Sequence, residues 1–198
     1  MNDIRINISD LTLSYGKDAF IKNFSLKVNG PSVVKIYGSN GAGKTSLLRY
    51  IAGIYEGNEK EGSIELESHQ TIKLLDNTPS LIDDLYVREN IKFFTKGSLI
   101  TTQQQEELLV KVGMQEFQDD LVSTLSSGMK RRIEIAILLW ASPSIVCLDE
   151  PGNFLDDDGM QVIDYLIKQI VQNQGIVVYS SLDGGKERIG YDMKVDLD

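Results

Sequence analysis

One eight-residue motif constrains the fold of this chain more than any other feature of the sequence. Residues 38–45 read Gly-Ser-Asn-Gly-Ala-Gly-Lys-Thr and match the pattern G-x-x-x-x-G-K-[ST]. The apolar run VVKIY (33–37) precedes the motif, and a segment with helical periodicity follows it from about residue 44 to residue 54. A loop of this pattern between a strand and a helix is typical of nucleotide phosphate binding. We therefore expect a loop at the carboxyl edge of a parallel sheet.

The residue types of this loop indicate what each would do. Its glycines, Gly38, Gly41 and Gly43, permit backbone conformations that aim N–H groups at phosphate oxygens. The helix that begins at Lys44 adds the positive end of its dipole, and the Lys44 ammonium is expected to reach the β- and γ-phosphates. The Thr45 hydroxyl is expected to bind Mg²⁺. The rest of the predicted nucleotide cradle consists of Ser39, Asn40, Ala42 and Ser46.

Buried strands and helices are predicted to alternate along the rest of the chain. Short apolar runs indicate strands at residues 144–148 and 176–179, and an amphipathic helix at 157–172 lies between them. Helical spacing of apolar residues also marks a central block with helices at 87–94, 101–112 and 128–140. Such alternation predicts an α/β fold with a mainly parallel sheet.

Period-two segments predict a second kind of sheet. Residues 4–13 and 20–28 alternate apolar and polar side chains, as half-exposed strands do. Residues 63–66 and 71–76 are expected to be short antiparallel strands, with the polar segment 56–63 as a loop before them. The C-terminal MKVDL is expected to form an edge strand.

Composition limits the class of protein. The 198 residues suit one domain, and a formal net charge of −9 argues against a general affinity for nucleic acid or anionic lipid. A single cysteine, Cys147, and a single histidine, His69, exclude an internal disulfide and a Cys/His zinc cluster, and they suit a reducing compartment. The longest apolar run, 135–141, is too short for a membrane helix. The N-terminus lacks the apolar core of a signal peptide.

Two acids follow the predicted strand at 144–148. Asp149 and Glu150 are expected at the sheet edge beside the phosphate loop, because carboxyl ends of parallel strands share one edge. Asp149 is the expected partner of Mg²⁺. Glu150 is expected to orient or deprotonate an attacking water.

Further motifs give the chain a family resemblance. Residues 125–129 (LSSGM) look like the signature LSGGQ of the ATP-binding subunits of ABC transporters. Residues 151–156 (PGNFLD) match the D-loop of that family, and residues 85–90 (LYVREN) match the stretch after its Q-loop. Tyr15 matches the aromatic residue that stacks on adenine. The sequence thus resembles an ABC-type P-loop ATPase core with an antiparallel β subdomain and a helical insertion.

The resemblance implies a division of the chain and a set of partners. The core is expected at about 1–79 and 143–198, and the helical subdomain at about 80–142. Family members hydrolyse ATP with Mg²⁺ as head-to-tail dimers, in which Ser126, Ser127 and Gly128 of one copy face the ATP of the other. An integral membrane subunit is expected as a separate chain, so this chain is expected to lie peripherally on the cytoplasmic face of the inner membrane.

Several positions depart from the family pattern. The Q-loop glutamine position holds Asn77, which the resemblance makes a nucleotide and Mg²⁺ contact. The switch histidine position holds Ser181, which joins Glu150 and Lys44 as an expected catalytic residue. Ser127 and Met129 replace a glycine and a glutamine in the signature. The expected groove for a membrane-subunit helix lies near Asn77.

The sequence also resembles one subfamily, and it leaves two alternative functions open. The short cassette, with GKTSLLRYIAGI after the phosphate loop, looks most like the ATPase of heme exporters in cytochrome c maturation. One alternative is a nucleotide-binding regulatory subunit with little turnover, motivated by Asn77 and Ser181. The other is a soluble ABC ATPase that is not coupled to transport.

Overall fold

The computed structural model divides into two compact units. It describes residues 5–66, 70–95, 100–153, 155–182 and 188–198. The first unit comprises Met1–Asp76, Pro143–Pro151 and Ile170–Asp198, and the second comprises Asn77–Ser142 and Gly152–Gln169. His69 lies outside the described residues. The core is expected at 143–198, and within that range Gly152–Gln169 belongs to the helical unit of the structure.

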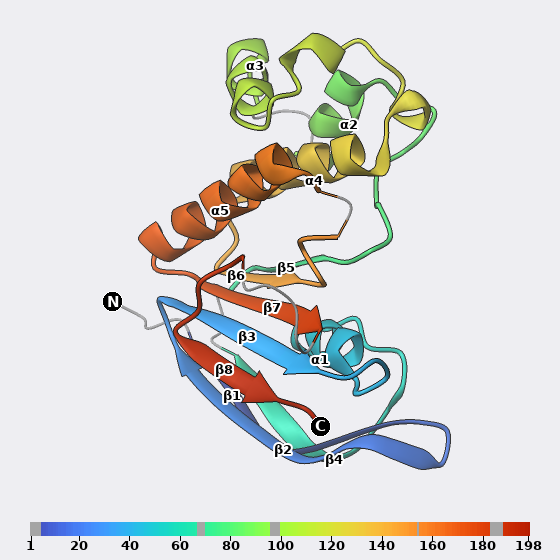
Figure 1. Cartoon of the computed structure of the whole chain (residues 1–198), viewed down its shortest axis with the longest axis vertical. Coiled ribbons are helices and arrows are strands. Elements are labelled where there is room, and N and C mark those ends of the chain that lie inside the picture. The colour runs from blue at the N-terminus through green and yellow to red at the C-terminus, as the bar shows by residue number, and fades with distance from the viewer. Residues whose placement is uncertain (1–4, 67–69, 96–99, 154, 183–187) are drawn as a thin grey trace. The chain divides into compact units, whose positions relative to one another are not determined.

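A parallel sheet forms the centre of the first unit (Figure 1). Its described strands run in the order β5-β6-β7-β3-β8, and every neighbouring pair is parallel. Their bounds are Ile72–Leu75 (β5), Ile145–Leu148 (β6), Ile176–Leu182 (β7), Ser32–Gly38 (β3) and Met193–Asp196 (β8). β6 and the first five residues of β7 are buried throughout, which explains their continuous apolar sequence. The edge position predicted for MKVDL is confirmed.

An antiparallel sheet also belongs to the first unit, with the order β2-β1-β4. β1 spans Arg5–Tyr15, β2 spans Asp18–Asn29 and β4 spans Asn58–Leu66. Two predictions are wrong here. The segment expected to be a loop at 56–63 is mostly strand. Its polar sequence does not indicate a strand, but its hydrogen bonds to β1 hold it in one. The segment 71–76 contains β5, which pairs parallel with β6 in the other sheet.

A bulge explains the glycine within β4. Gly62 has φ +105°, and a Cβ there would lie 2.5 Å from Leu11 Cα. The register between β1 and β4 shifts between Ser9 and Thr12, beside this close approach. A glycine is required because a larger residue would meet the backbone of β1.

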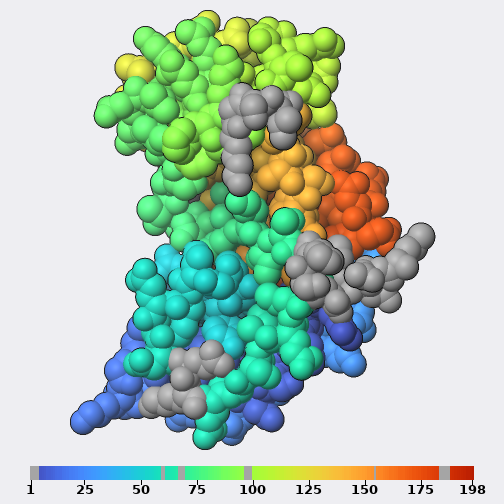
Figure 2. Space-filling model, turned by 180° about the vertical axis from the view of Figure 1, so that it is seen from behind, coloured from blue at the N-terminus to red at the C-terminus, as the bar shows by residue number. Residues whose placement is uncertain are grey.

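One apolar core joins the two sheets to helix α1 (Lys44–Ile51). Its residues include Ile8 and Leu26 of the antiparallel sheet, Ile36 and Val178 of the parallel sheet, and Leu48 of the helix. The space-filling view shows the cyan residues around α1 packed directly against the blue N-terminal strands (Figure 2). This packing fixes α1, and therefore the loop before it, on the parallel sheet.

Helices make up the second unit. They are α2 (Val87–Phe94), α3 (Thr102–Lys111), α4 (Ser127–Ala141) and most of α5 (Asp157–Gln172), with short 3₁₀ turns at Gln115–Phe117 and Val122–Thr124. These helices confirm the helices predicted from the spacing of apolar residues in the sequence. Thr101 caps α3, since its hydroxyl accepts the Gln104 amide at 3.2 Å while the Gln104 side chain accepts the Thr101 amide at 2.9 Å. No described helix has the length and apolar character needed to span a membrane.

Candidate nucleotide-binding site

The phosphate loop leaves β3 and is held by its own lysine. The Lys44 ammonium donates to the Gly38 carbonyl at 2.8 Å and to the Ser39 carbonyl at 2.9 Å. The side chain is buried, so the chain encloses a positive charge at the start of α1. An ammonium has three N–H donors, and two of them are used by these carbonyls.

The loop also requires glycine at its last turn before α1. Gly43 has φ +100° and caps the helix in the left-handed region. A Cβ at this position would lie 2.7 Å from the ring of Phe20 on β2. The close approach brings an aromatic side chain of the antiparallel sheet against the phosphate loop.

Two stacked aromatic rings stand beside the loop. The ring centres of Tyr15 and Phe20 are 5.4 Å apart with an interplanar angle of 17°, and Tyr15 is 55% exposed. The Ser46 hydroxyl contacts the Tyr15 hydroxyl at 3.5 Å. Both rings line a cavity of about 380 Å³ whose other walls are Asn40, Gly41, Gly43, Lys44, Thr45, Ser46 and Glu150. An exposed aromatic face beside a phosphate loop is suited to a nucleotide base.

The acids after β6 meet the loop. The Thr45 hydroxyl donates to one oxygen of the Asp149 carboxylate at 2.8 Å, and Asp149 is 3% exposed. Glu150 follows in the left-handed region with φ +44° and lines the same cavity. The structure thus brings together the Thr45, Asp149 and Glu150 side chains that the sequence analysis places at one sheet edge.

The oxygen donors fit a magnesium ion. Mg²⁺ prefers hydroxyl, carboxylate and phosphate oxygens in an octahedron, and its adjacent ligands lie about 3 Å apart. The Thr45 and Asp149 oxygens are 2.8 Å apart. Among the described residues no cluster of three or more His, Cys, Asp or Glu side chains is arranged for a metal, so phosphates and waters would complete such a shell.

Two side-chain hydrogen-bond partnerships in this site are not predicted from the sequence. The Ser39 amide and hydroxyl both donate to the Asp198 carboxylate, at 2.9 and 2.7 Å. These donors, with the Lys44 charge nearby, hold the pKa of Asp198 below its usual value. The Ser180 hydroxyl donates to Asp149 at 2.6 Å. The partners are 159 and 31 residues apart, so no local spacing indicates either contact.

Two expected residues are placed differently. The Ser181 hydroxyl donates to the Leu182 carbonyl at 3.1 Å, which is a local contact within β7. Asn77 is exposed and belongs to the second unit. The roles assigned to both by resemblance remain predictions.

The second unit carries the glycine-bearing turn before α4. The Ser126 hydroxyl accepts the Met129 amide at 3.2 Å and caps the helix. Ser126, Ser127 and Gly128 line a cavity of about 370 Å³ together with Gly113, Met114, Phe117, Met129, Arg132 and Asp156. The cavity therefore combines a helix N-terminus, which favours an anion, with the ion-paired side chains of Arg132 and Asp156.

Comparison with known proteins identifies the family. The model of the ABC transporter family matches residues 21–153, from β2 to the segment after β6. That stretch contains the phosphate loop, the turn before α4 and both acids. The chain belongs to the ABC transporter family.

Relatives in this family cover most of the chain. The cytochrome c biogenesis ATP-binding export protein CcmA of Vibrio parahaemolyticus is 32% identical over 189 residues, which cover 89% of this chain and 91% of that protein. The lantibiotic transport ATP-binding protein SrtF of Streptococcus pyogenes is 30% identical over 183 residues, covering 89% and 79%. The predicted resemblance to ABC ATPases of the cytochrome c maturation type is confirmed.

Solved ABC structures share the fold. A putative ABC transporter ATP-binding protein from Pyrococcus furiosus superposes with a TM-score of 0.82 at 23% identity, covering 98% of this chain and 97% of that one. A bacterial Atm1-family ABC exporter with ATP bound superposes with a TM-score of 0.77 at 19% identity, covering 90% of this chain and 35% of that one. The predicted ABC ATPase fold class is confirmed.

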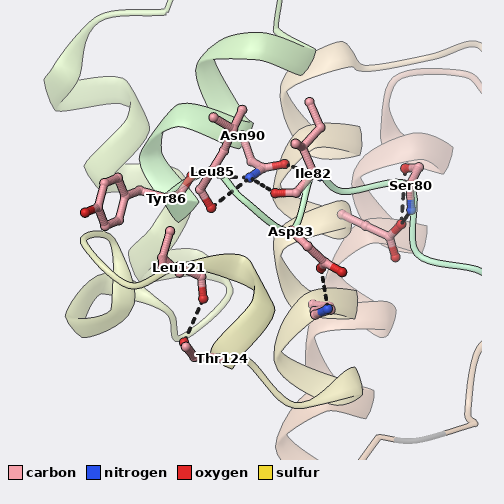
Figure 3. A network of polar contacts seen from close by, with 10 residues as sticks. Ser80, Ile82, Asp83, Leu85, Tyr86, Asn90, Leu121 and Thr124 are labelled. Atoms are coloured by element: carbon pink, nitrogen blue, oxygen red, sulfur yellow. Dashed lines mark hydrogen bonds and ion pairs between the residues drawn. The ribbon is translucent and has the colours of Figure 1, made fainter.

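A polar network orders the segment that precedes α2 in this ABC protein (Figure 3). Asn90 is completely buried, and its side chain accepts the Ile82 amide at 2.8 Å and donates to the Ile82 carbonyl at 3.0 Å. Lys130 of α4 forms an ion pair with Asp83 at 2.6 Å. The Ser80 amide donates to Glu134 of α4 at 2.8 Å. Ser80 and Asp83 thus contact α4, while Ile82 is held by Asn90 of α2.

Asp156 makes two contacts near the start of α5. The Asp156 carboxylate accepts the Gly159 amide at 2.8 Å in the first turn of α5 and pairs with Arg132 of α4 at 2.8 Å. The amide contact and then the guanidinium hold the pKa of Asp156 below its usual value. Asp156 therefore joins α5 to the α4 cavity.

Proposed function

We propose that this chain is the ATP-binding and ATP-hydrolysing subunit of an ABC transporter whose membrane-spanning part is a separate chain. The observation that carries the proposal is the 2.8 Å contact between Thr45 and Asp149. It joins the phosphate loop after β3 to the acidic end of β6, and these two side chains would supply oxygen ligands to a nucleotide-bound Mg²⁺.

The residues around this contact suit phosphoryl transfer to water. Lys44 and the N-terminus of α1 would stabilise negative charge on the β- and γ-phosphates, and Tyr15 would stack on adenine. Mg²⁺ held by Thr45 and Asp149 would supply charge neutralisation. Glu150 would accept a proton as the water oxygen bonds to the γ-phosphorus and the bond to the bridging oxygen breaks, which releases ADP and phosphate.

A second copy and a membrane protein would complete the assembly. The cavity at Ser126, Ser127 and Gly128 offers a helix N-terminus to an anion, which suits the γ-phosphate of ATP held by the other copy. A membrane subunit would dock near Asn77 and keep the chain peripheral on the cytoplasmic face of the inner membrane. The CcmA relatives favour heme export for cytochrome c biogenesis, and the SrtF relative makes a peptide the competing substrate.

A second candidate function rests on β7. By resemblance Ser181 would occupy the position of the family's switch histidine, and its hydroxyl donates to the Leu182 carbonyl. A chain that lacks a cationic group at this position would suit a regulatory subunit that binds nucleotide but turns it over slowly. Phosphate release by the purified chain, alone and with its membrane subunit, separates the two candidates.

The experiment compares Glu150→Gln with the parent chain. Removal of the base should leave Mg-ATP binding intact, slow phosphate release at least tenfold and trap a nucleotide-bound dimer that light scattering detects as a doubled mass. Glu107→Gln, an exposed substitution on α3, is the matched control and should behave as the parent. One unchanged mass for all three proteins with and without ATP would contradict the dimer.

The transported substrate needs a separate measurement. The chain is reconstituted in vesicles with a candidate membrane subunit, and ATP turnover is measured with heme or with a lanthionine peptide. Heme export predicts stimulation by heme alone. Stimulation by the peptide alone would assign the chain to peptide transport.

A further inference from the structure

Ser180 of β7 contacts both acids of the candidate site. Its hydroxyl donates to Oδ1 of Asp149 at 2.6 Å and accepts the backbone amide of Glu150 at 2.8 Å. Its side chain is buried, with 1% of the residue exposed. A hydroxyl can donate one hydrogen bond while it accepts others, so a single buried group orders two consecutive residues.

The register of the parallel sheet puts Ser180 in this place. Leu148, the last residue of β6, pairs with Tyr179 of β7. The next residues along the two strands, Asp149 and Ser180, are therefore level with each other at the carboxyl edge. β7 also pairs with β3, where Ile36 lies opposite Ser180. Ser180 thus lies on the strand between the one that leads to the phosphate loop and the one that leads to the acids.

The two oxygens of Asp149 have different partners. Oδ1 accepts from Ser180, and Oδ2 accepts from Thr45 of the phosphate loop. Hydrogen bonds on both oxygens fix the rotation of the carboxylate, because turning it would break one of them. Ser180 therefore determines which way Oδ2 faces, and Oδ2 is the atom beside the expected Mg²⁺ ligand Thr45.

Glu150 depends on Ser180 through its backbone. Its φ of +44° lies in the left-handed region, which non-glycine residues seldom adopt. The hydrogen bond from its amide to Ser180 holds the backbone in this region. The direction in which the Glu150 side chain leaves the chain follows from that backbone conformation. The neighbouring Ser181 makes a local contact with Leu182 instead.

We infer that Ser180 is a positioning residue that orients the Asp149 carboxylate toward the metal site and the Glu150 side chain toward the attacking water. This inference rests on the proposed ATPase function. A hydrogen bond to a charged group that is lost inside a protein typically changes an equilibrium or rate by about 10- to 100-fold. That loss should fall on metal affinity and turnover, since Ser180 contacts the two acids and not the adenine site or the phosphate cradle.

The test uses Ser180→Ala, Ser180→Thr and a matched control, Ser144→Ala. Ser144 precedes β6 at the opposite end of that strand, where its hydroxyl accepts the Thr71 amide at 3.4 Å. Four quantities are measured for the full chain: kcat, KM for ATP, the Mn²⁺ dissociation constant by electron paramagnetic resonance with ATP bound, and the melting temperature. Threonine retains the hydroxyl and suits a strand.

The inference predicts a particular pattern. Ser180→Ala should lower kcat and weaken Mn²⁺ binding at least tenfold, with KM for ATP and metal-free ATP affinity changed by less than about threefold. Ser180→Thr should restore both quantities to within about threefold of the parent. Ser144→Ala should match the parent in kcat and Mn²⁺ affinity, whatever its melting temperature.

Other outcomes overturn it in distinguishable ways. If the parent binds Mg-ATP and hydrolyses it while Ser180→Ala does so equally well, the positioning role is wrong and the proposed function stands. The role is also wrong if Ser180→Ala weakens metal-free ATP binding as much as metal binding, because the hydroxyl then only supports the fold. If the parent binds no Mg-ATP, the proposed function fails and the inference fails with it.

Discussion

The ammonium of Lys44 provides the sharpest test of the nucleotide site. Two of its three N–H donors are used by the Gly38 and Ser39 carbonyls at 2.8 and 2.9 Å. The third donor and the full positive charge can serve a phosphate. A single hydrogen bond between charged groups in a partly buried site contributes about 2–3 kcal/mol. Lys44→Ala should therefore weaken Mg-ATP binding about 30- to 150-fold.

Calorimetric titration with a slowly hydrolysed ATP analogue measures the effect. Lys194→Ala removes the same charge from β8, where the ammonium lies 4.1 Å from the Tyr37 ring centre, and it should leave the affinity within about twofold of the parent. Lys44→Met keeps the length of the side chain and should match Lys44→Ala. Equal affinity of parent and both Lys44 variants would refute the assignment of this lysine to the phosphates.

Three further predictions concern other parts of the chain. Gly43→Ala should lower the free energy of unfolding by at least about 1 kcal/mol more than Gly41→Ala, measured in urea, because both have positive φ but only the Gly43 Cβ would meet a neighbour. The lowered pKa of Asp156 means that its ionised form stabilises the fold at neutral pH and that this contribution is lost as the pH falls below about 4; the difference in unfolding free energy between parent and Asp156→Asn should therefore shrink at about pH 2.5. Ser181→His should raise phosphate release by the parent chain, and adding Glu150→Gln should abolish the gain; a parent that already turns over several ATP per second, or no change with histidine, would rule this out.

The sequence predicts those parts of the site that depend on local pattern. The G-x-x-x-x-G-K-[ST] pattern between a buried strand and a helix predicts the phosphate loop and its lysine, although it does not predict the contacts of Lys44 with the Gly38 and Ser39 carbonyls. The meeting of Thr45 and Asp149 follows from a general rule about the carboxyl ends of parallel strands. Neither inference needs the order of strands in the sheet.

Contacts that depend on strand order or register could not be predicted in this way. Ser180 and Ser181 are neighbours of the same type, and only the pairing of Leu148 with Tyr179 distinguishes the one that reaches Asp149. The Ser39–Asp198 contact depends on β8 lying beside β3. The segment 71–76 has too few residues for its pattern to reveal whether its partner strand is parallel or antiparallel.

The position of β7 between β3 and β6 has a consequence for how the chain folds. The strand that leads to the phosphate loop and the strand that leads to the acids are not neighbours, and β7 fills the space between them. β3 (residues 32–38) can therefore pair in the sheet only once β7 (residues 176–182) has reached it. Bringing together segments so far apart in the sequence costs conformational entropy before their contacts form. The helical unit is built from residues between 77 and 169, so its contacts join segments that are closer in the sequence than β3 and β7. We expect refolding in two phases, with helix signal recovered before nucleotide binding, and a chain that stops short of β7 should refold only the first.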